Sequence, residues 1–530
     1  MHTRVYPLGT RPTASNGVLF RHHGAWWALA CAAATILLAL LVATLDVLPV
    51  LVLLLALCAG VLLVLHPGLA APMVVLLVYT NIPVLVTHSM GVPALVASSF
   101  VLVLGLPLLH YTLVRREPLR FDVTFWLMLV LLGAMMLSSS RAKGTDDAIA
   151  YMKTYVTEGV ILYWLIVNAV RSRRTLQQVI WTLLGAGALL GALTTYQVVT
   201  GRYDQEFGGL AQRNYEYRSV LELDPEDPAT QELIVGFDGG RNQRAKGPMS
   251  EPNRFAQVLL FLVPLALFGY RTSSSRAGRW AAACAGLLIF AGIVFTESRA
   301  AFIVLVCMAL LAAWMRWIRW AHILAAGLVG SIMIVAFAPQ YLERVASIAN
   351  VSALTEGTTS KRADGAIRGR ATQMLAAAQV FADYPMLGVG PGQYAPYYSI
   401  EYQNSNPNFQ FRQIDTTRRA HSLYLEMAAE LGVLGLGLLL SIFGVQLAML
   451  GRARRVWRDR MPEFSELATA LSLSLVSFLG TSLFLHLSYQ RYLWLLLAIC
   501  SAAIAVLAGR RSGYAGGTGT ESPLPQSVNA

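Results

Sequence analysis

Long apolar runs joined by short polar connections make up most of the sequence from about residue 25 to residue 511. A helix needs about 20 largely apolar residues to cross the hydrocarbon core of a bilayer. Runs near this length lie at residues 25–44, 47–65, 70–87, 92–113, 122–138, 154–170, 177–199, 255–270, 280–297, 300–315, 321–338, 429–450, 465–487 and 491–508. They predict an all-α polytopic membrane protein with about 12–14 transmembrane helices. The number is a range because one short hairpin and the run that contains Glu158 fit the pattern less well than the other runs.

The composition leads to the same fold class. Hydrophobic residues make up 56% of the 530 residues and charged residues only 13%, whereas soluble domains carry about 25% charged residues. One membrane domain over residues 25–511 is therefore predicted. The run that starts at about Ala25 is long for a signal-peptide core, so we expect an uncleaved first helix after a polar segment, residues 1–24. Residues 512–530, rich in Gly, Ser, Thr and Pro, are expected to form a disordered tail.

Basic residues predict the orientation in the membrane. A net charge of +12 is also typical of nucleic-acid-binding proteins, but here the arginines and lysines gather between the apolar runs. The basic connections are the N-terminal segment and residues 115–120, 171–174, 271–279, 316–319, 452–460 and 510–511. With fourteen spans they all fall on one side, which the positive-inside rule makes cytoplasmic. We therefore expect membrane lipids as the surroundings, no nucleic acid partner, and both termini in the cytoplasm.

Two long loops, residues 201–253 and 339–426, leave the membrane on the opposite side. Loops longer than about 15 residues are usually functional or disordered, and the aromatic residues in these favour function. Within the second loop, residues 370–381 place Met374, Ala378 and Phe381 on one helical face. This spacing predicts an amphipathic helix on the outer membrane surface.

The segment from Arg244 to Asn253 (RAKGPMSEPN) comes directly before an apolar run. Asn253 is predicted to cap the helix that follows, and the backbone N–H groups of a helix start attract anions. Arg244 and Lys246 add positive charge nearby. An ordinary loop with scattered basic residues fits the same segment.

Further arginines stand on the predicted outer side, against the charge bias of the chain. Arg299 lies in a short connection (ESRA) between two apolar runs, where it is either functional or an interfacial anchor. Arg368 and Arg370 lead into the predicted surface helix, and either guanidinium suits phosphate oxygens.

His421 stands at the outer mouth of a span, in the same loop as Arg370. A neutral imidazole there can accept a proton from a sugar hydroxyl, although a single histidine is more often structural or solvated. Glu426 and Glu430 follow at about one and two helical turns and are candidates to orient or tune it.

Aromatic residues fill the loop between the arginines and His421. They indicate an interfacial belt or, secondarily, a platform on which sugar rings stack. These residues are Tyr394, Tyr397, Tyr398, Tyr402, Phe409 and Phe411, with Tyr424 after His421.

Several kinds of chemistry lack their sequence signatures. The five cysteines fall inside apolar runs without metal-ligand spacing, and no zinc motif, P-loop or nucleophile elbow is present. We therefore predict neither a metal nor a cofactor.

These four segments, in this order, resemble the O-antigen ligase and polymerase superfamily of bacterial envelope glycosyltransferases. The resemblance covers residues 240–440 and rests on Arg244 with Pro252-Asn253, Ser298-Arg299-Ala300, DYPMLGVGPG at 383–392 and HSLYLEMAAELG at 421–432. Ala300 stands where many relatives have Gly, and Ser422 stands where Asn is common.

The resemblance implies a GT-C-like fold with two large periplasmic loops in the bacterial inner membrane. It implies metal-independent, inverting transfer of a glycan from undecaprenyl pyrophosphate to an acceptor hydroxyl, such as lipid A–core or another glycan. Arg299 and Arg370, with Arg244, would bind the pyrophosphate, and His421 would be the general base. Lys246, Asn253, Arg368, Tyr394 and Tyr424 are further candidates for substrate binding. A polysaccharide polymerase is the alternative within the superfamily, and a lipid-linked oligosaccharide flippase is the alternative outside it.

Overall fold

The structure is a computed structural model that describes Leu63 and residues 66–90, 99–203, 205, 207–211, 244–337, 340–346, 365–405, 417–487 and 490–515. The chain forms two compact units, Met1–Pro67 and Gly68–Ala530. Almost all of the first unit, including the predicted runs 25–44 and 47–65, lies outside the described residues. Everything below concerns the second unit.

The described residues form helices and no β-strand, which confirms the predicted all-α class. In the first part of the unit these are η1 (Pro67–Leu69), α3 (Ala70–Tyr79), α4 (Ile82–Met90), η2 (Ser99–Leu104), α6 (Gly105–Leu109), η3 (His110–Val114), α7 (Val123–Ser138), η4 (Ser139–Arg141), α8 (Thr145–Thr154), η5 (Tyr155–Ile161), α9 (Leu162–Ala169), α10 (Arg173–Thr200) and η6 (Phe207–Gly209). In the second part they are α13 (Pro252–Leu260), α14 (Val263–Thr272), α15 (Arg276–Phe295), α16 (Arg299–Trp314), α17 (Trp320–Phe337), α18 (Gln340–Ala346), α19 (Gly365–Asp383), η8 (Tyr394–Tyr398), α20 (Ser399–Asn404), α21 (Leu423–Trp457), α22 (Pro462–Thr481) and α23 (Gln490–Ala515).

Among the described residues, seven helical stretches are long and apolar enough to cross a membrane. They are Val123–Arg141, Arg173–Thr200, Pro252–Thr272, Arg276–Phe295, Leu423–Trp457, Pro462–Thr481 and Gln490–Ala508. Four shorter apolar stretches accompany them: Pro67–Tyr79, Val101–Val114, Arg299–Trp314 and Trp320–Ala336. Each long stretch coincides with a predicted apolar run, so the protein is a multi-pass membrane protein.

Several predicted spans are interrupted, and two of the interruptions have a polar partner. The run 70–87 is divided into α3 and α4 at Asn81, whose φ of 61° is left-handed and whose side-chain amide donates to the carbonyl of Pro248 at 2.8 Å. The run that contains Glu158 includes the π-helix η5, and Glu158 is paired with Arg491 at 3.4 Å. The polar partner explains how each of these two interruptions is accommodated.

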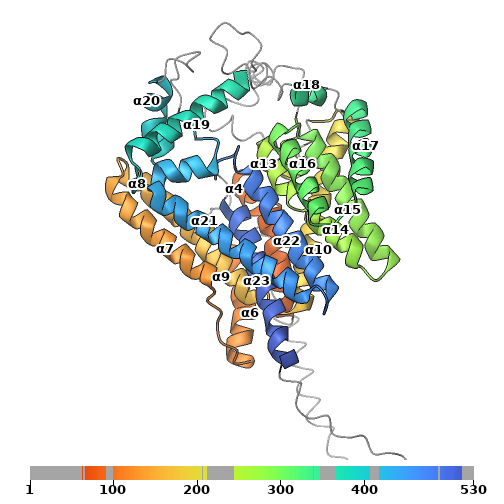
Figure 1. Ribbon diagram of the computed structural model, residues 1–530. Helices are drawn as coiled ribbons and strands as arrows, with labels where there is room; N and C mark the ends of the chain where they lie inside the picture. The colour runs from red at the N-terminus through yellow and green to blue at the C-terminus, as the bar shows by residue number, and fades with distance from the viewer. Residues whose placement is uncertain are drawn as a thin grey trace, which may run out of the picture. The chain divides into compact units, whose positions relative to one another are not determined.

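The predicted basic connections meet at one end of the helix bundle. Arg173 pairs with Glu463, and Arg271 pairs with Glu466 at 2.8 Å. Arg454 donates to the carbonyl of Met315 at 3.0 Å. The helices α18, α19 and α20 lie at the opposite end (Figure 1). Three of the predicted basic connections thus lie at the end of the bundle opposite to these helices, and their orientation in the membrane stays a prediction.

The glycine-rich segment before α20 packs against a break in α21. The break lies at Gly432, whose φ is 63° and ψ −162°. Backbone N–H groups of Val389 and Gly390 donate to the carbonyls of Ala429 and Glu430, at 3.0 and 2.9 Å. A Cβ on Gly388 would lie 2.3 Å from a backbone atom of Glu430. Only glycine permits this approach, so the sequence of the turn is explained by its packing.

Candidate functional site

The site is built first from the segment that precedes α13. Arg244 donates through Nε to the carbonyl of Thr296 at 2.8 Å and through an Nη to Oδ1 of Asn253 at 3.2 Å. The prediction that Asn253 caps α13 is wrong. The cap position belongs to Glu251, and Pro252 occupies the first turn because it needs no N–H partner there. Asn253 instead holds the guanidinium of Arg244. Lys246 lies half-buried in the same segment.

Arg299 begins α16, directly after a strained connection. Glu297 has a φ of 51° and is buried, and Ser298 caps the helix by accepting from the N–H of Ala301 at 3.4 Å. The hydroxyl of Tyr341 on α18 donates to the carbonyl of Ser298 at 2.9 Å. Arg299 is therefore held at the start of α16. The same connection binds Arg244 through the carbonyl of Thr296.

The predicted surface helix exists as α19, but its buried face differs from the predicted stripe. Residues Met374, Ala378 and Phe381 are only half-buried, while the face with Ala377 and Val380 is fully enclosed. That face packs in one cluster with Tyr394, Tyr398, Val389, Ala420 and Ala429. Arg370 lies half-buried near the helix start; Arg368 is in the same helix, and its side chain is outside the described residues.

The backbone of His421 is held in an unusual conformation from both sides. Its φ of 49° is left-handed, which a residue with a Cβ adopts only at a cost of about 1–3 kcal/mol. Before it, the N–H of Ala420 donates to a carboxylate oxygen of Glu426 at 3.2 Å. After it, the N–H of Leu423 donates to the carbonyl of Ser482 at 3.0 Å. Surrounding contacts thus fix the direction in which the imidazole points.

The two ring nitrogens of His421 have different surroundings. Nδ1 is enclosed and has no hydrogen-bond partner among the described residues, whereas Nε2 is not among the enclosed atoms that lack a partner. The pKa of His421 is lowered to about 4, first by burial and then by the positive charges of Arg370 and Arg254, which the carboxylates of Glu251 and Glu426 oppose. The imidazole is therefore neutral at physiological pH and lies close enough to the Arg370 guanidinium for that charge to act on it.

Two neighbours of His421, Arg254 and His486, were missed from the sequence. Arg254 is buried and pairs with Glu251 at 2.7 Å. His486 follows α22, and its ring lies edge to face with that of His421, with centroids 5.4 Å apart. Burial and the charge of Arg254 keep the pKa of His486 well below its usual range. No motif marks these residues, because α13 and the connection 482–487 meet His421 only through tertiary packing.

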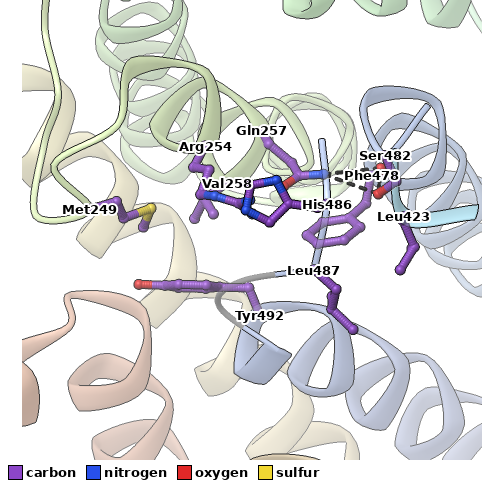
Figure 2. Close-up of a pocket in the computed structure, with 10 residues that line it drawn as sticks. All are labelled: Met249, Arg254, Gln257, Val258, Leu423, Phe478, Ser482, His486, Leu487 and Tyr492. Atoms are coloured by element: carbon purple, nitrogen blue, oxygen red, sulfur yellow. Dashed lines mark hydrogen bonds between the residues drawn. The ribbon is translucent and has the colours of Figure 1, made fainter. Parts of the chain in front are cut away.

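A small cavity adjoins this cluster on the side of His486. It is lined by Met249, Arg254, Gln257, Val258, Leu423, Phe478, Ser482, His486, Leu487 and Tyr492 (Figure 2). Its volume is about 10 Å³, room for about one water molecule. A sugar does not fit this space, so substrate must approach His421 from another direction.

The two carboxylates of α21 hold neighbouring segments. Glu426 accepts from Nε and an Nη of Arg419 with its two carboxylate oxygens. Glu430 accepts from the N–H groups of Gly392 and Tyr394, at 2.9 and 3.3 Å. Burial and the negative charge of Glu430 raise the pKa of the nearby Tyr151 hydroxyl above its usual range. Neither carboxylate touches the His421 ring by a hydrogen bond; both fix the backbone around it.

The predicted aromatic candidates have structural contacts. Tyr394 is fully buried and donates to the carbonyl of Gln373 at 3.1 Å, and Tyr424 donates to the carbonyl of Leu479 at 2.9 Å. Tyr397 is exposed and donates to Asp147 at 2.7 Å. Phe409 and Phe411 lie outside the described residues. Substrate binding by Tyr394 and Tyr424 stays a prediction.

Within the described part of the chain, no group of three or more His, Cys, Asp and Glu side chains is arranged to hold a metal ion. The prediction of a metal-independent site stays a prediction.

The fold and this site define a multi-pass helical membrane protein with arginines and a neutral histidine gathered at one end of the bundle. Residues 284–440 match the family model described as O-Antigen ligase. Over these residues the chain matches an O-antigen ligase domain, which confirms the resemblance for the three motif segments between Ser298 and Gly432. The matched segment contains Arg299, Arg370 and His421, whereas Arg244 precedes it. A comparison with the curated proteins returned no match.

Proposed function

We propose that this protein is a lipid-linked glycan transferase of the O-antigen ligase type. It transfers a glycan from undecaprenyl pyrophosphate to an acceptor hydroxyl of lipid A–core or a similar glycan. The observation that carries this proposal is the neutral His421, with Arg370 close enough for its charge to lower the His421 pKa. An imidazole of this kind can accept a hydroxyl proton, and a guanidinium beside it suits a phosphate.

The proposed donor site consists of Arg370, Arg299 and Arg244, with Lys246 and Arg368 as further basic residues. Support for Arg244 comes from its hydrogen bonds to Thr296 and Asn253, which orient the guanidinium before any substrate arrives. A fixed cation costs little reorganisation when charge develops on the leaving group. One such donor contributes on the order of 3 kcal/mol to the barrier by analogy with oxyanion holes.

The proposed reaction is a single displacement at the anomeric carbon. The acceptor hydroxyl gives its proton to Nε2 of His421 while its oxygen bonds to the anomeric carbon. The bond from that carbon to the pyrophosphate oxygen breaks, and the electron pair leaves with undecaprenyl pyrophosphate. The configuration inverts because the acceptor enters opposite the leaving group. A positioned base contributes roughly 10²- to 10⁴-fold to the rate.

The same site serves a polymerase if the acceptor is a second lipid-linked repeat unit. The resemblance of the His421 segment and of the glycine-rich turn to ligase-type members favours a ligase. A flippase would place ionisable groups at mid-depth in broken helices. Arg370 and Arg254 lie close enough to His421 for their charges to lower its pKa, and this cluster argues for chemistry instead.

In the proposed orientation, the connections that contain Arg173, Arg271 and Arg454 face the cytoplasm of a bacterium. The positive-inside rule supports this placement. Both termini are then cytoplasmic and His421 faces the periplasm, as a GT-C-like transferase in the inner membrane requires.

Deleting the gene and examining surface polysaccharide on a gel tests the proposal. Long glycans that stay on the lipid carrier identify a ligase, whereas a single repeat unit on the acceptor identifies a polymerase. His421→Ala, expressed at the normal level, should reproduce the deletion. His322→Ala is the matched control, because His322 is exposed on α17. A wild-type ladder from His421→Ala would exclude the proposed base.

A further inference from the structure

His421 and His486 form a pair of imidazoles in contact. Their ring centroids are 5.4 Å apart and their planes are nearly perpendicular, at 84°. Two imidazoles joined by an N–H···N hydrogen bond of about 2.9 Å have centroids roughly 5 Å apart, because each nitrogen lies about 1 Å from its ring centre. The observed spacing is therefore close to that of a hydrogen-bonded pair.

Each of the two rings has one enclosed nitrogen that lacks a hydrogen-bond partner among the described residues. These nitrogens are Nδ1 of His421 and Nδ1 of His486. A buried polar atom without a partner costs about 1–3 kcal/mol. Since both rings are neutral at physiological pH, one can carry a hydrogen on Nδ1 while the other offers a lone pair.

The guanidinium of Arg419 contacts both of the segments that carry the two histidines. Arg419 pairs with Glu426 and also donates to the carbonyl of Leu487 at 3.3 Å. Arg419 stands two residues before His421, and Leu487 directly follows His486. The hydrogen bond from Leu423 to Ser482 fastens the same two segments a second time. The ring contact is thus built into the fold from both sides.

We propose that His486 is a positioning residue that acts through His421. In the reacting state, Nδ1–H of His421 donates to Nδ1 of His486. This hydrogen bond sets the tautomer of His421 in which Nε2 carries the lone pair, and it turns that nitrogen toward the acceptor hydroxyl. After His421 has taken the hydroxyl proton, the same hydrogen bond stabilises the imidazolium, which the positive charges of Arg370 and Arg254 repel.

This inference rests on the proposed function, in which His421 is the base. Its test compares two variants of the full-length protein in proteoliposomes. His486→Phe keeps a ring without a nitrogen, and His486→Asn keeps an acceptor close to the place of Nδ1. The donor is undecaprenyl-pyrophosphate-linked glycan extracted from the deletion strain, and the acceptor is lipid A–core from the same cells.

We expect His486→Phe to lower kcat by roughly 10- to 100-fold, as loss of an orienting partner does elsewhere, with KM for the donor nearly unchanged. His486→Asn should retain clearly more activity than His486→Phe. Tyr492→Phe is the matched control, because Tyr492 lines the same cavity and its hydroxyl contacts Tyr79 instead. It should leave kcat within about twofold of the wild type, well below the effect expected of a positioning partner.

His486→Ala provides a second route if the larger variants assemble poorly. Added imidazole should restore its activity, whereas pyrrole, a ring of similar size without an acceptor nitrogen, should not. Equal activity of His486→Phe and wild type, or equal rescue by pyrrole and imidazole, overturns the inference. An active His421→Ala protein would instead overturn the proposed function, so the two failures are distinguishable.

Discussion

Glu426 lies one helical turn into α21 and holds the guanidinium of Arg419, seven residues earlier, with both carboxylate oxygens. The same carboxylate accepts the N–H of Ala420, so it fixes the residue that precedes His421. Arg419 in turn reaches the carbonyl of Leu487. One ion pair therefore connects the start of α21 with both histidine-bearing segments.

Glu426→Gln should destabilise the protein and lower its activity together. The substitution leaves the charge of Arg419 without its carboxylate; because the Arg419 side chain is 31% exposed, we expect about 1–3 kcal/mol rather than the full cost of a buried ion. Thermal unfolding in detergent, followed by tryptophan fluorescence, measures this loss. Glu463→Gln is the control, since its pair with Arg173 is more exposed and should contribute less than about 1 kcal/mol. Equal melting temperatures of the two variants would contradict the role of Glu426.

Arg370→Gln should move the acid limb of the pH profile of kcat/KM. Neutral His421 is the active form, so activity is complete above the pKa, about 4 in the free protein, and is lost as the pH falls through it. Removing a positive charge favours the protonated form and raises the pKa toward the ordinary value of about 6.5. The ratio of kcat/KM at pH 5 to that at pH 7.5 should therefore fall in Arg370→Gln.

The control for this pH effect is Arg454→Gln at the opposite end of the bundle, where Arg454 contacts Met315. It should leave the ratio unchanged. An unchanged ratio in Arg370→Gln would show that Arg370 does not govern the protonation of His421.

Arg299→Gln should reduce kcat by on the order of 10²- to 10³-fold, the loss expected for one donor to a developing anion. Arg299→Lys keeps the charge but loses the forked donor geometry, so its activity should lie between Arg299→Gln and wild type. Initial rates of glycan transfer in proteoliposomes check this order. Wild-type rates in Arg299→Lys would argue against two-point phosphate binding, and wild-type rates in Arg299→Gln would remove Arg299 from the donor site.

Gly432→Ala should prevent correct packing of the turn before α20. A Cβ at this residue would lie 2.3 Å from the carbonyl oxygen of Met386, and its φ of 63° with ψ of −162° suits only glycine. The expected cost exceeds about 2 kcal/mol, measured as loss of monodisperse protein on size exclusion. Gly437→Ala is the control in the same helix, because nothing lies within 4 Å of its added Cβ. Normal yield of both variants would contradict the packing argument.

Much of the membrane architecture was predictable, because it depends on local patterns. Apolar runs of sufficient length fold as helices wherever water is absent, and α7, α10, α15 and α22 coincide with the predicted runs. The stripe through Met374 and Phe381 predicted a helix, and α19 is that helix. The face of α19 that packs against the protein was not predictable, because it depends on the packing of Tyr394 and Tyr398.

The candidate site was predictable only in part, for the same reason. Arg244, Arg299, Arg370 and His421 stand out because charge is rare in an apolar chain and because their motifs resemble a family. Arg254, Arg419 and His486 carry no motif. Their importance comes from contacts between segments far apart in the chain, such as Arg419 with Leu487.

The sequence by itself determined the helical class, the positions of most spans and the grouping of basic connections at one end, since hydropathy and charge act through the local environment of each residue. Tertiary structure alone decided the surroundings of His421: its left-handed backbone, its enclosed Nδ1 and its contact with His486. Basicity and orientation depend on burial and on charges within a few ångströms, and only the packing of α13, α19, α21 and the connection 482–487 brings those charges together.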